Sequence, residues 1–172
     1  MNENQLDNVG AFEAKEIRFL HLSKNKFTRV PWTSDSVEYL DLDENEIDAD
    51  PDRILLLYKK LKRLDMKDNK LEILPEMPSS IIEVNLISNK IKFINDYVLS
   101  QLPNMKRLFI SNNNIYKIYL PEAFYLSKLE ILDIENNSVQ MDPAIKDWCK
   151  SENQTNDFCK FAQNAEFVVY KL

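Results

Sequence analysis

Six asparagine residues recur in one sequence context, at spacings of 20, 24, 20, 24 and 24 residues. They are Asn25, Asn45, Asn69, Asn89, Asn113 and Asn137. The residues eight, five and three positions before each asparagine, and two positions after it, are apolar in every repeat. Because only 44% of the chain is hydrophobic, this register cannot arise by chance. The period predicts an array of stacked repeats, in which each repeat buries its apolar face against the next.

Each repeat follows the pattern L-x-x-L-x-L-x-x-N-x-L, with other apolar residues at some leucine positions. These positions are Ile17, Leu20, Leu22, Phe27; Val37, Leu40, Leu42, Ile47; Leu61, Leu64, Met66, Leu71; Ile81, Val84, Leu86, Ile91; Met105, Leu108, Ile110, Ile115; Leu129, Leu132, Ile134 and Val139. On this pattern the chain resembles the leucine-rich-repeat family over residues 17–141. The resemblance implies an α/β solenoid: a curved array with a parallel sheet on its concave face and short helices or 3₁₀ turns on its convex face.

The pattern assigns a physical role to each position. The x-L-x-L stretch predicts a short strand, because alternation sends every second side chain inward. Each coil then turns sharply inside the stack, where backbone groups need partners that water cannot supply. An asparagine amide both donates and accepts hydrogen bonds, so it can serve two adjacent coils at once. We therefore interpret the six asparagines as a structural ladder and not as a ligand site.

The two repeat lengths predict different return segments. The 24-residue repeats have room for about two helical turns, and we expect helices within residues 52–61, 96–102 and 121–126. The 20-residue repeats return through the compact segments 26–36 and 70–80. Segment 70–80 contains Pro75 and Pro78, which favour extended or 3₁₀ backbone. It is similar to the short repeats of bacterial effector proteins.

The sequence divides into an N-terminal flank (1–16), six repeats (17–141) and a C-terminal capping segment (142–172). Caps are expected because a terminal coil would otherwise expose one side of its core. A small apolar element is predicted at residues 9–12, a helix at 142–150 and a short closing strand at 167–170. The two cysteines, Cys149 and Cys159, are too few for a disulfide framework, so we expect them reduced, although a bridge between them stays open.

Composition and charge narrow the classes of partner. The formal net charge is −6, which gives no general attraction to nucleic acid or anionic lipid. No apolar run approaches the roughly 18 residues of a membrane helix, and the N-terminus lacks the features of a signal peptide. We expect a cytoplasmic monomer that binds a protein and neither nucleic acid nor membrane.

The outward positions of the predicted strands supply the candidate partner-binding residues. Aligned on the asparagines, these are Phe19, Tyr39, Asp41, Arg63, Asp65, Asn85, Ile87, Arg107, Phe109 and Asp133. Aromatic and arginine side chains are enriched at protein interfaces, which favours a binding role for the concave face. The competing interpretation is a solvated sheet face whose cross-strand ion pairs contribute little.

Catalytic and metal-binding motifs are absent from the sequence. A single glycine, Gly10, excludes the phosphate-binding and dinucleotide-binding loops, and a single histidine, His21, excludes motifs built on two histidines. Asp41 and Asp65 are expected side by side on adjacent strands, but an open sheet has no pocket that would shift their pKa values. The sequence predicts no enzyme activity, no metal and no cofactor.

Three functions remain open at this point. The first is a protein–protein interaction module, an adaptor or regulatory subunit that binds through the concave face. The second is a secreted or injected effector or recognition-receptor domain. The third is a purely structural or oligomerising array. The repeat pattern does not choose a partner, because one scaffold serves many unrelated ones.

Overall fold

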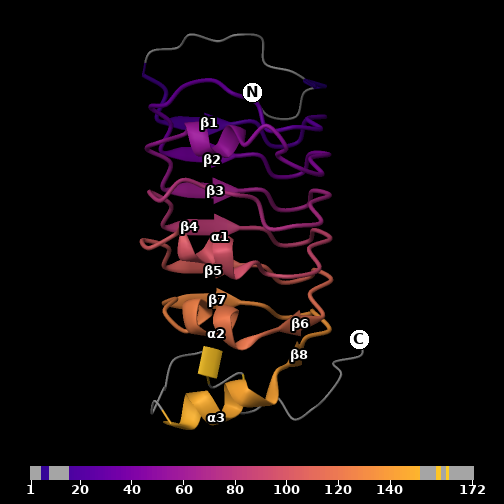
Figure 1. Cartoon of the computed structure of the whole chain (residues 1–172). Coiled ribbons are helices and arrows are strands. Elements are labelled where there is room, and N and C mark those ends of the chain that lie inside the picture. Colours follow the sequence, from indigo (N-terminus) through magenta and orange to yellow (C-terminus); the bar gives the residue numbers. More distant parts are fainter. Residues whose placement is uncertain (1–4, 8–15, 152–157, 160–161, 163–172) are drawn as a thin grey trace.

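The computed structural model describes residues 5–7, 16–151, 158–159 and 162 of the 172-residue chain. These residues form coils stacked one upon another from the N-terminal to the C-terminal end (Figure 1). One short strand from each repeat joins a six-stranded parallel sheet, and short helices lie in the return segments. The predicted α/β solenoid is confirmed.

The main sheet contains β1, β2, β3, β4, β5 and β7 in that order. Their bounds are Phe19–His21, Tyr39–Asp41, Arg63–Asp65, Glu83–Asn85, Arg107–Phe109 and Ile131–Asp133. Equivalent residues pair at every step of the sheet, so that Leu40 lies between Leu20 and Leu64. Such a register keeps each column of outward side chains aligned along the stack.

The apolar positions of the repeat pattern fill one continuous core. All are buried except Ile17, Met105 and Leu132, which are partly buried and pack against it. Burial of apolar surface contributes about 25 cal/mol per Å² and supplies the main driving force for stacking the coils. The repeat pattern therefore predicted which of its positions are buried, with three partly buried exceptions.

The ladder asparagines join neighbouring coils, as predicted. In the third repeat, Asn69 Nδ2 donates to Met66 O of its own coil at 3.2 Å and to Leu42 O of the preceding coil at 2.9 Å. Its Oδ1 accepts from the Ile47 N–H at 3.0 Å. The same bonds recur at Asn45, Asn89, Asn113 and Asn137. Each amide thus satisfies backbone groups that the turn removes from water.

The residue just before each ladder asparagine has a left-handed backbone. The φ angles there lie between 53° and 56°, at Lys24, Glu44, Asp68, Ser88, Asn112 and Asn136. This conformation costs a residue with a Cβ atom about 1–2 kcal/mol, and glycine adopts it freely. The single glycine of the chain, Gly10, stands at none of these positions. Every coil therefore turns at a conformational cost that its hydrogen bonds and packing offset.

The return segments differ as the repeat lengths predict. The 24-residue repeats contain η1, a 3₁₀ helix at Ile54–Leu57, and the α-helices α1 (Asp96–Ser100) and α2 (Leu120–Leu126). η1 occupies only the middle of the predicted range 52–61, and α2 begins one residue earlier than predicted. The 20-residue repeats have no helix in residues 26–36 or 70–80. A coil of that length has no residues left for a helical turn.

Side chains at the start of each of these helices explain where it begins. Asp50 accepts from the N–H groups of Ile54 and Leu55, each at 2.9 Å, ahead of η1. Asn95 caps α1 by accepting from the Tyr97 N–H at 2.9 Å. In α2, Glu122 reaches back to the Tyr119 N–H at 3.1 Å. Such bonds satisfy donors that have no partner within the helix.

A second, two-stranded parallel sheet was not predicted. It consists of β6 (Lys117–Ile118) and β8 (Gln140–Met141). An isolated bridge also joins Lys117 of β6 to Phe93, which lies in the preceding coil. These strands follow the ladder asparagines and lie to one side of the main sheet (Figure 1). The pattern in the sequence marks buried positions and carries no signal for this backbone pairing.

At the N-terminal end, Leu6 extends the ladder beyond the first repeat. Its N–H donates to Asn25 Oδ1 at 3.3 Å, and its carbonyl accepts from the Lys26 N–H at 2.8 Å. Phe27 makes the equivalent two bonds with the next coil. Leu6 therefore makes the two hydrogen bonds to the first repeat that a residue of a preceding coil would otherwise make. The apolar element predicted at residues 9–12 lies outside the described residues.

At the C-terminal end, α3 (Pro143–Ser151) closes the stack and buries Ile145 and Cys149. This confirms the helix predicted at residues 142–150. The expectation of reduced cysteines is wrong: Cys149 and Cys159 form a disulfide, with Cα atoms 5.6 Å apart. The chain returns to α3 after residue 151, and spacing alone did not reveal that return. The strand predicted at residues 167–170 lies outside the described residues, and the division at residues 16/17 and 141/142 stays a prediction.

Candidate functional site

The outward side chains of the main sheet form one surface, which we call the strand face. It comprises the first and third residues of β1 to β5 and β7, and the residue two positions after each strand. All ten predicted site residues lie on it: Phe19, Tyr39, Asp41, Arg63, Asp65, Asn85, Arg107, Phe109 and Asp133 within the strands, and Ile87 after β4. The in-register pairing of the strands brings them together.

The strand face is less uniformly exposed than the sequence suggested. Phe19 at one end is 63% exposed, and Ile131 at the other end is 44% exposed. In contrast, the side chains of Asp41 and Asp65 are almost buried. The expectation of an open, solvated carboxylate pair is wrong for these two, because neighbouring side chains cover them.

A connected series of charged hydrogen bonds crosses the strand face from β2 to β5. Tyr39 Oη donates to Asp65 Oδ2 at 2.7 Å, and Arg63 Nη2 donates to the same oxygen at 3.0 Å. Arg63 Nη1 lies 3.2 Å from Glu83 Oε1, and Arg107 Nε donates to Glu83 Oε2. The Arg63 guanidinium also lies 5.1 Å from the centre of the Tyr39 ring. These contacts hold the side chains in fixed positions before any partner arrives.

A second cluster surrounds Asp41. His21 Nδ1 lies 3.2 Å from Asp41 Oδ2, and Ser23 Oγ donates to that oxygen at 3.0 Å. The imidazole also meets the Tyr39 ring edge-on at 5.1 Å. In a catalytic triad the imidazole stands between hydroxyl and carboxylate. Here the hydroxyl and the imidazole both contact the carboxylate, so the cluster lacks an activated nucleophile.

Burial and neighbouring charges raise the pKa values of two side chains on this face. Burial raises the pKa of Asp43 to about 6, and the charges of Asp65 and Asp41 act in the same direction against the hydrogen bond from the Lys67 N–H. Burial and the bond to Asp65 raise the pKa of Tyr39 well above its usual value. The Tyr39 hydroxyl therefore stays protonated at physiological pH and can donate a hydrogen bond.

Nothing in the described residues assembles a metal centre or a membrane span. Within residues 5–7, 16–151, 158–159 and 162, no three His, Cys, Asp or Glu side chains group in a way that could hold a metal ion. In the same part of the chain, no helix has the length and apolar character needed to cross a bilayer.

A second exposed apolar surface lies beside the β6–β8 sheet and was not predicted from the sequence. Ile73 and Phe93 occupy the same position, four residues after a ladder asparagine, in adjacent coils, and are 53% and 44% exposed. The ring of Tyr116 packs edge-on against Phe93 with centroids 6.3 Å apart. Tyr119 stands nearby with its ring under the Lys117 ammonium group at 4.5 Å. An alignment extended four positions past each asparagine would have revealed Ile73 and Phe93.

Comparison with known proteins supports the fold. Residues 79–139 match the sequence model described as "Leucine rich repeat". Comparison with curated protein sequences finds no significant match. The fold is typically non-catalytic, and no enzyme family matches the chain.

Three solved structures illustrate the structural likeness. The chain in a TLR13–ssRNA13 complex is 26% identical, with a TM-score of 0.67 over 74% of this chain and 19% of its own length. The functional domain of InlJ from Listeria monocytogenes is 20% identical, with a TM-score of 0.58 over 75% and 28%. A chain in a complex of Latrophilin 3, Unc5D and the FLRT2 leucine-rich repeats is 21% identical, with a TM-score of 0.60 over 81% and 52%.

This chain spans between 19% and 52% of the length of those three chains. The match in sequence covers the fourth to sixth repeats, where the apolar grid and the asparagine ladder are complete. The same grid, ladder and parallel sheet continue through the first three repeats. On this sequence pattern, coil geometry and structural likeness, the chain is a leucine-rich-repeat protein, of a fold that generally serves to bind other proteins.

Proposed function

We propose that this chain is a protein–protein interaction module, an adaptor or regulatory subunit that binds one protein partner through the strand face. The supporting observation is the ordered network from Tyr39 through Arg63 to Arg107, flanked by exposed Phe19 and Ile131. Polar groups that are already oriented lose little conformational entropy on binding. Apolar anchors at both ends add the buried surface that interfaces need.

The experiment is a pull-down with the full chain and a strand-face variant, Phe19→Ser/Arg107→Ala/Ile131→Ser. These three side chains are at least partly exposed, so their loss leaves the core intact. Tyr39 and Arg63 are kept, because removing either would take one of its two donor side chains from the nearly buried Asp65. The retained protein is identified, and its affinity for both chains is measured by titration calorimetry.

We expect the variant to lose at least about tenfold in affinity, since truncated interface anchors cost more than about 1 kcal/mol each. A matched control on another face, Lys60→Ala/Lys128→Ala, should bind like the parent. Equal binding by parent and strand-face variant refutes the proposal. A chain that captures no partner but self-associates supports the structural or oligomerising alternative instead.

A second candidate function, a secreted or injected effector or receptor domain, is favoured by the Cys149–Cys159 disulfide. Both cysteines are fully buried and packed in the core that closes the last coil. Disulfides persist in oxidising compartments and are rare in the cytosol. Thiol titration of unfolded protein from its native source separates the two proposals: a cytoplasmic adaptor should show two free thiols, and a secreted domain none.

Nucleic acid is a weaker candidate partner. One of the similar structures is a complex with a single-stranded RNA, but RNA binding requires cationic surface along the backbone. This chain carries a net charge of −6, and Arg63 and Arg107 are already paired with Asp65 and Glu83. We therefore propose a protein as the partner.

A further inference from the structure

The short repeat between η1 and α1 leaves a groove on the side of the stack opposite the main sheet. Residues 70–80 pass there without a helix, while η1 precedes them and α1 follows. Two adjoining hollows lie over this segment, with volumes of about 380 and 340 Å³, and both are lined by Arg53, Glu76 and Val98. The groove therefore results from the missing helical turn of a 20-residue repeat between two longer ones.

The other 20-residue repeat carries a bulkier side chain at the corresponding position. Seven residues after its ladder asparagine stands Trp32, whose ring packs against Tyr58 with centroids 4.9 Å apart. In the repeat that carries the groove, the same position is Glu76, which forms an ion pair with Arg53 at 3.0 Å. The two 20-residue repeats therefore differ at this position: one carries a tryptophan packed against Tyr58, and the other a glutamate paired with Arg53.

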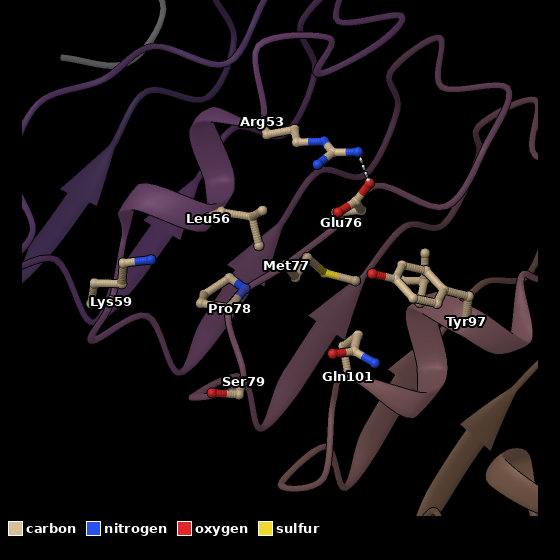
Figure 2. A pocket seen from close by; sticks show the side chains of 10 residues that line it. Arg53, Leu56, Lys59, Glu76, Met77, Pro78, Ser79, Tyr97 and Gln101 are labelled. Carbon is tan, nitrogen blue, oxygen red and sulfur yellow. Dashed lines mark ion pairs between the residues drawn. The ribbon is translucent and has the colours of Figure 1, made fainter.

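The walls of the larger hollow combine apolar surface with aromatic and polar rims. Met77 and Pro78 form its floor, with Leu56 on the η1 side and Val98 on the α1 side. Figure 2 shows Tyr97 reaching from α1 toward Met77, and this residue is 60% exposed. An exposed tyrosine beside methionine and proline is typical of surfaces that hold a peptide side chain.

The charge of the larger hollow is positive, although the whole chain is acidic. Its lining contains Arg53, Lys59 and Glu76, and Glu76 is engaged by Arg53 (Figure 2). Among the described residues, no carboxylate forms an ion pair with Lys59, whose ammonium group is therefore left for an occupant. In a chain of net charge −6, a cationic end beside an apolar floor favours an acidic partner segment.

We propose that this groove binds an extended peptide segment of a partner protein, in which an acidic side chain stands next to a bulky apolar one. The carboxylate pairs with Lys59, and the apolar side chain packs between Met77 and the Tyr97 ring. Both hollows together accommodate a few residues of extended chain along segment 70–80. This site is separate from the strand face, so the proposal does not rest on the function proposed above.

The test uses the full chain and a phage-displayed library of random eight-residue peptides. The most enriched peptide is then synthesised with a fluorophore, and its binding is measured by fluorescence polarisation. Glu76→Trp places in the groove the bulky residue that the other short repeat carries at the same position. Lys59→Glu reverses the free charge, and Lys60→Glu is its matched control, because Lys60 is exposed and does not line either hollow.

We expect enriched peptides with Asp or Glu beside a large apolar residue, and a loss of at least about tenfold in affinity with Glu76→Trp or Lys59→Glu. Lys60→Glu and the strand-face variant should bind within about twofold of the parent. If Glu76→Trp does not fold, as judged by circular dichroism, the exposed substitutions Lys59→Glu and Tyr97→Ala carry the test.

Several results would overturn the proposal. Failure to enrich any peptide, enrichment of peptides without an acidic residue, or equal binding by Lys59→Glu would each do so. Dimers that form in sedimentation experiments and disappear with Lys59→Glu would assign the groove to a second copy of the chain instead.

Discussion

Replacing Asn89 with alanine should destabilise the whole array, because this residue joins two adjacent coils through three backbone groups. Its Nδ2 donates to Met66 O at 2.9 Å and to Leu86 O at 3.2 Å, and its Oδ1 accepts from the Leu71 N–H at 3.0 Å. The Asn89 side chain is almost buried, so water does not replace these bonds in the substituted protein.

The size of the effect follows from the hydrogen-bond partners that each backbone group keeps after the substitution. The two carbonyls keep one partner each, since Asn69 Nδ2 also donates to Met66 O and Asn113 Nδ2 to Leu86 O. Each should lose about 0.5–1 kcal/mol. The Leu71 N–H is left without an acceptor, which costs about 1–3 kcal/mol. We therefore expect Asn89→Ala to lower the free energy of unfolding by about 2–5 kcal/mol.

Urea denaturation followed by circular dichroism measures this change. The control is Asn114→Ala, which removes an exposed asparagine and should alter stability by less than about 0.5 kcal/mol. An unchanged denaturant slope would show that the coils still unfold together. If Asn89→Ala and Asn114→Ala melt alike, the ladder does not hold the coils in the way described, and the reasoning is refuted.

Four further predictions concern other parts of the array. Leu86→Ala should cost about 2–5 kcal/mol in urea denaturation, because Leu86 is fully buried in mid-array, and a parental midpoint would contradict the repeat register. Ser88→Gly should raise the free energy of unfolding by about 0.5–1 kcal/mol, since φ is 56° there; a loss of stability would count against backbone strain at the turn. The folded-state pKa of Asp43, about 6, lies above its ordinary value of 3.8, so the folded state loses stability as pH rises through that window. The stability of Asp43→Asn should therefore exceed that of the parent above pH 6 and match it near pH 3, as measured by thermal melts across pH; a constant difference would exclude this titration. Cys149→Ser should cost about 2–4 kcal/mol by opening the loop that the disulfide closes, and a melting temperature equal to that of the oxidised parent would show that the bridge adds nothing.

The repeat register, the core and the asparagine ladder were all predictable from the sequence. Each depends on one repeat at a time: an apolar side chain at Leu64 is buried because alternation turns it inward, and every coil repeats that geometry. Repeat length also predicted which return segments contain a helix. A local count of residues is enough for both inferences.

The strand face was predicted in place but not in detail. The sequence aligned Asp41 and Asp65, and the register of β2 and β3 confirms that alignment. It did not show that Tyr39 and Arg63 reach over to Asp65 and shield it from water. These contacts depend on the rotamers of two long side chains, Tyr39 on the adjacent strand and Arg63 on the same strand, which an alignment of the repeats does not specify.

Contacts between unlike segments were decided by the tertiary structure alone. The disulfide joins α3 to residue 159, Leu6 completes the ladder from outside the repeats, and β6 pairs with β8 through backbone atoms. The groove over residues 70–80 exists because a short coil lies between η1 and α1, which belong to longer ones. Periodicity in a sequence specifies what is the same in every coil. Features that arise where neighbouring coils differ, or where the array ends, depend on the distance between segments once stacking has brought them together.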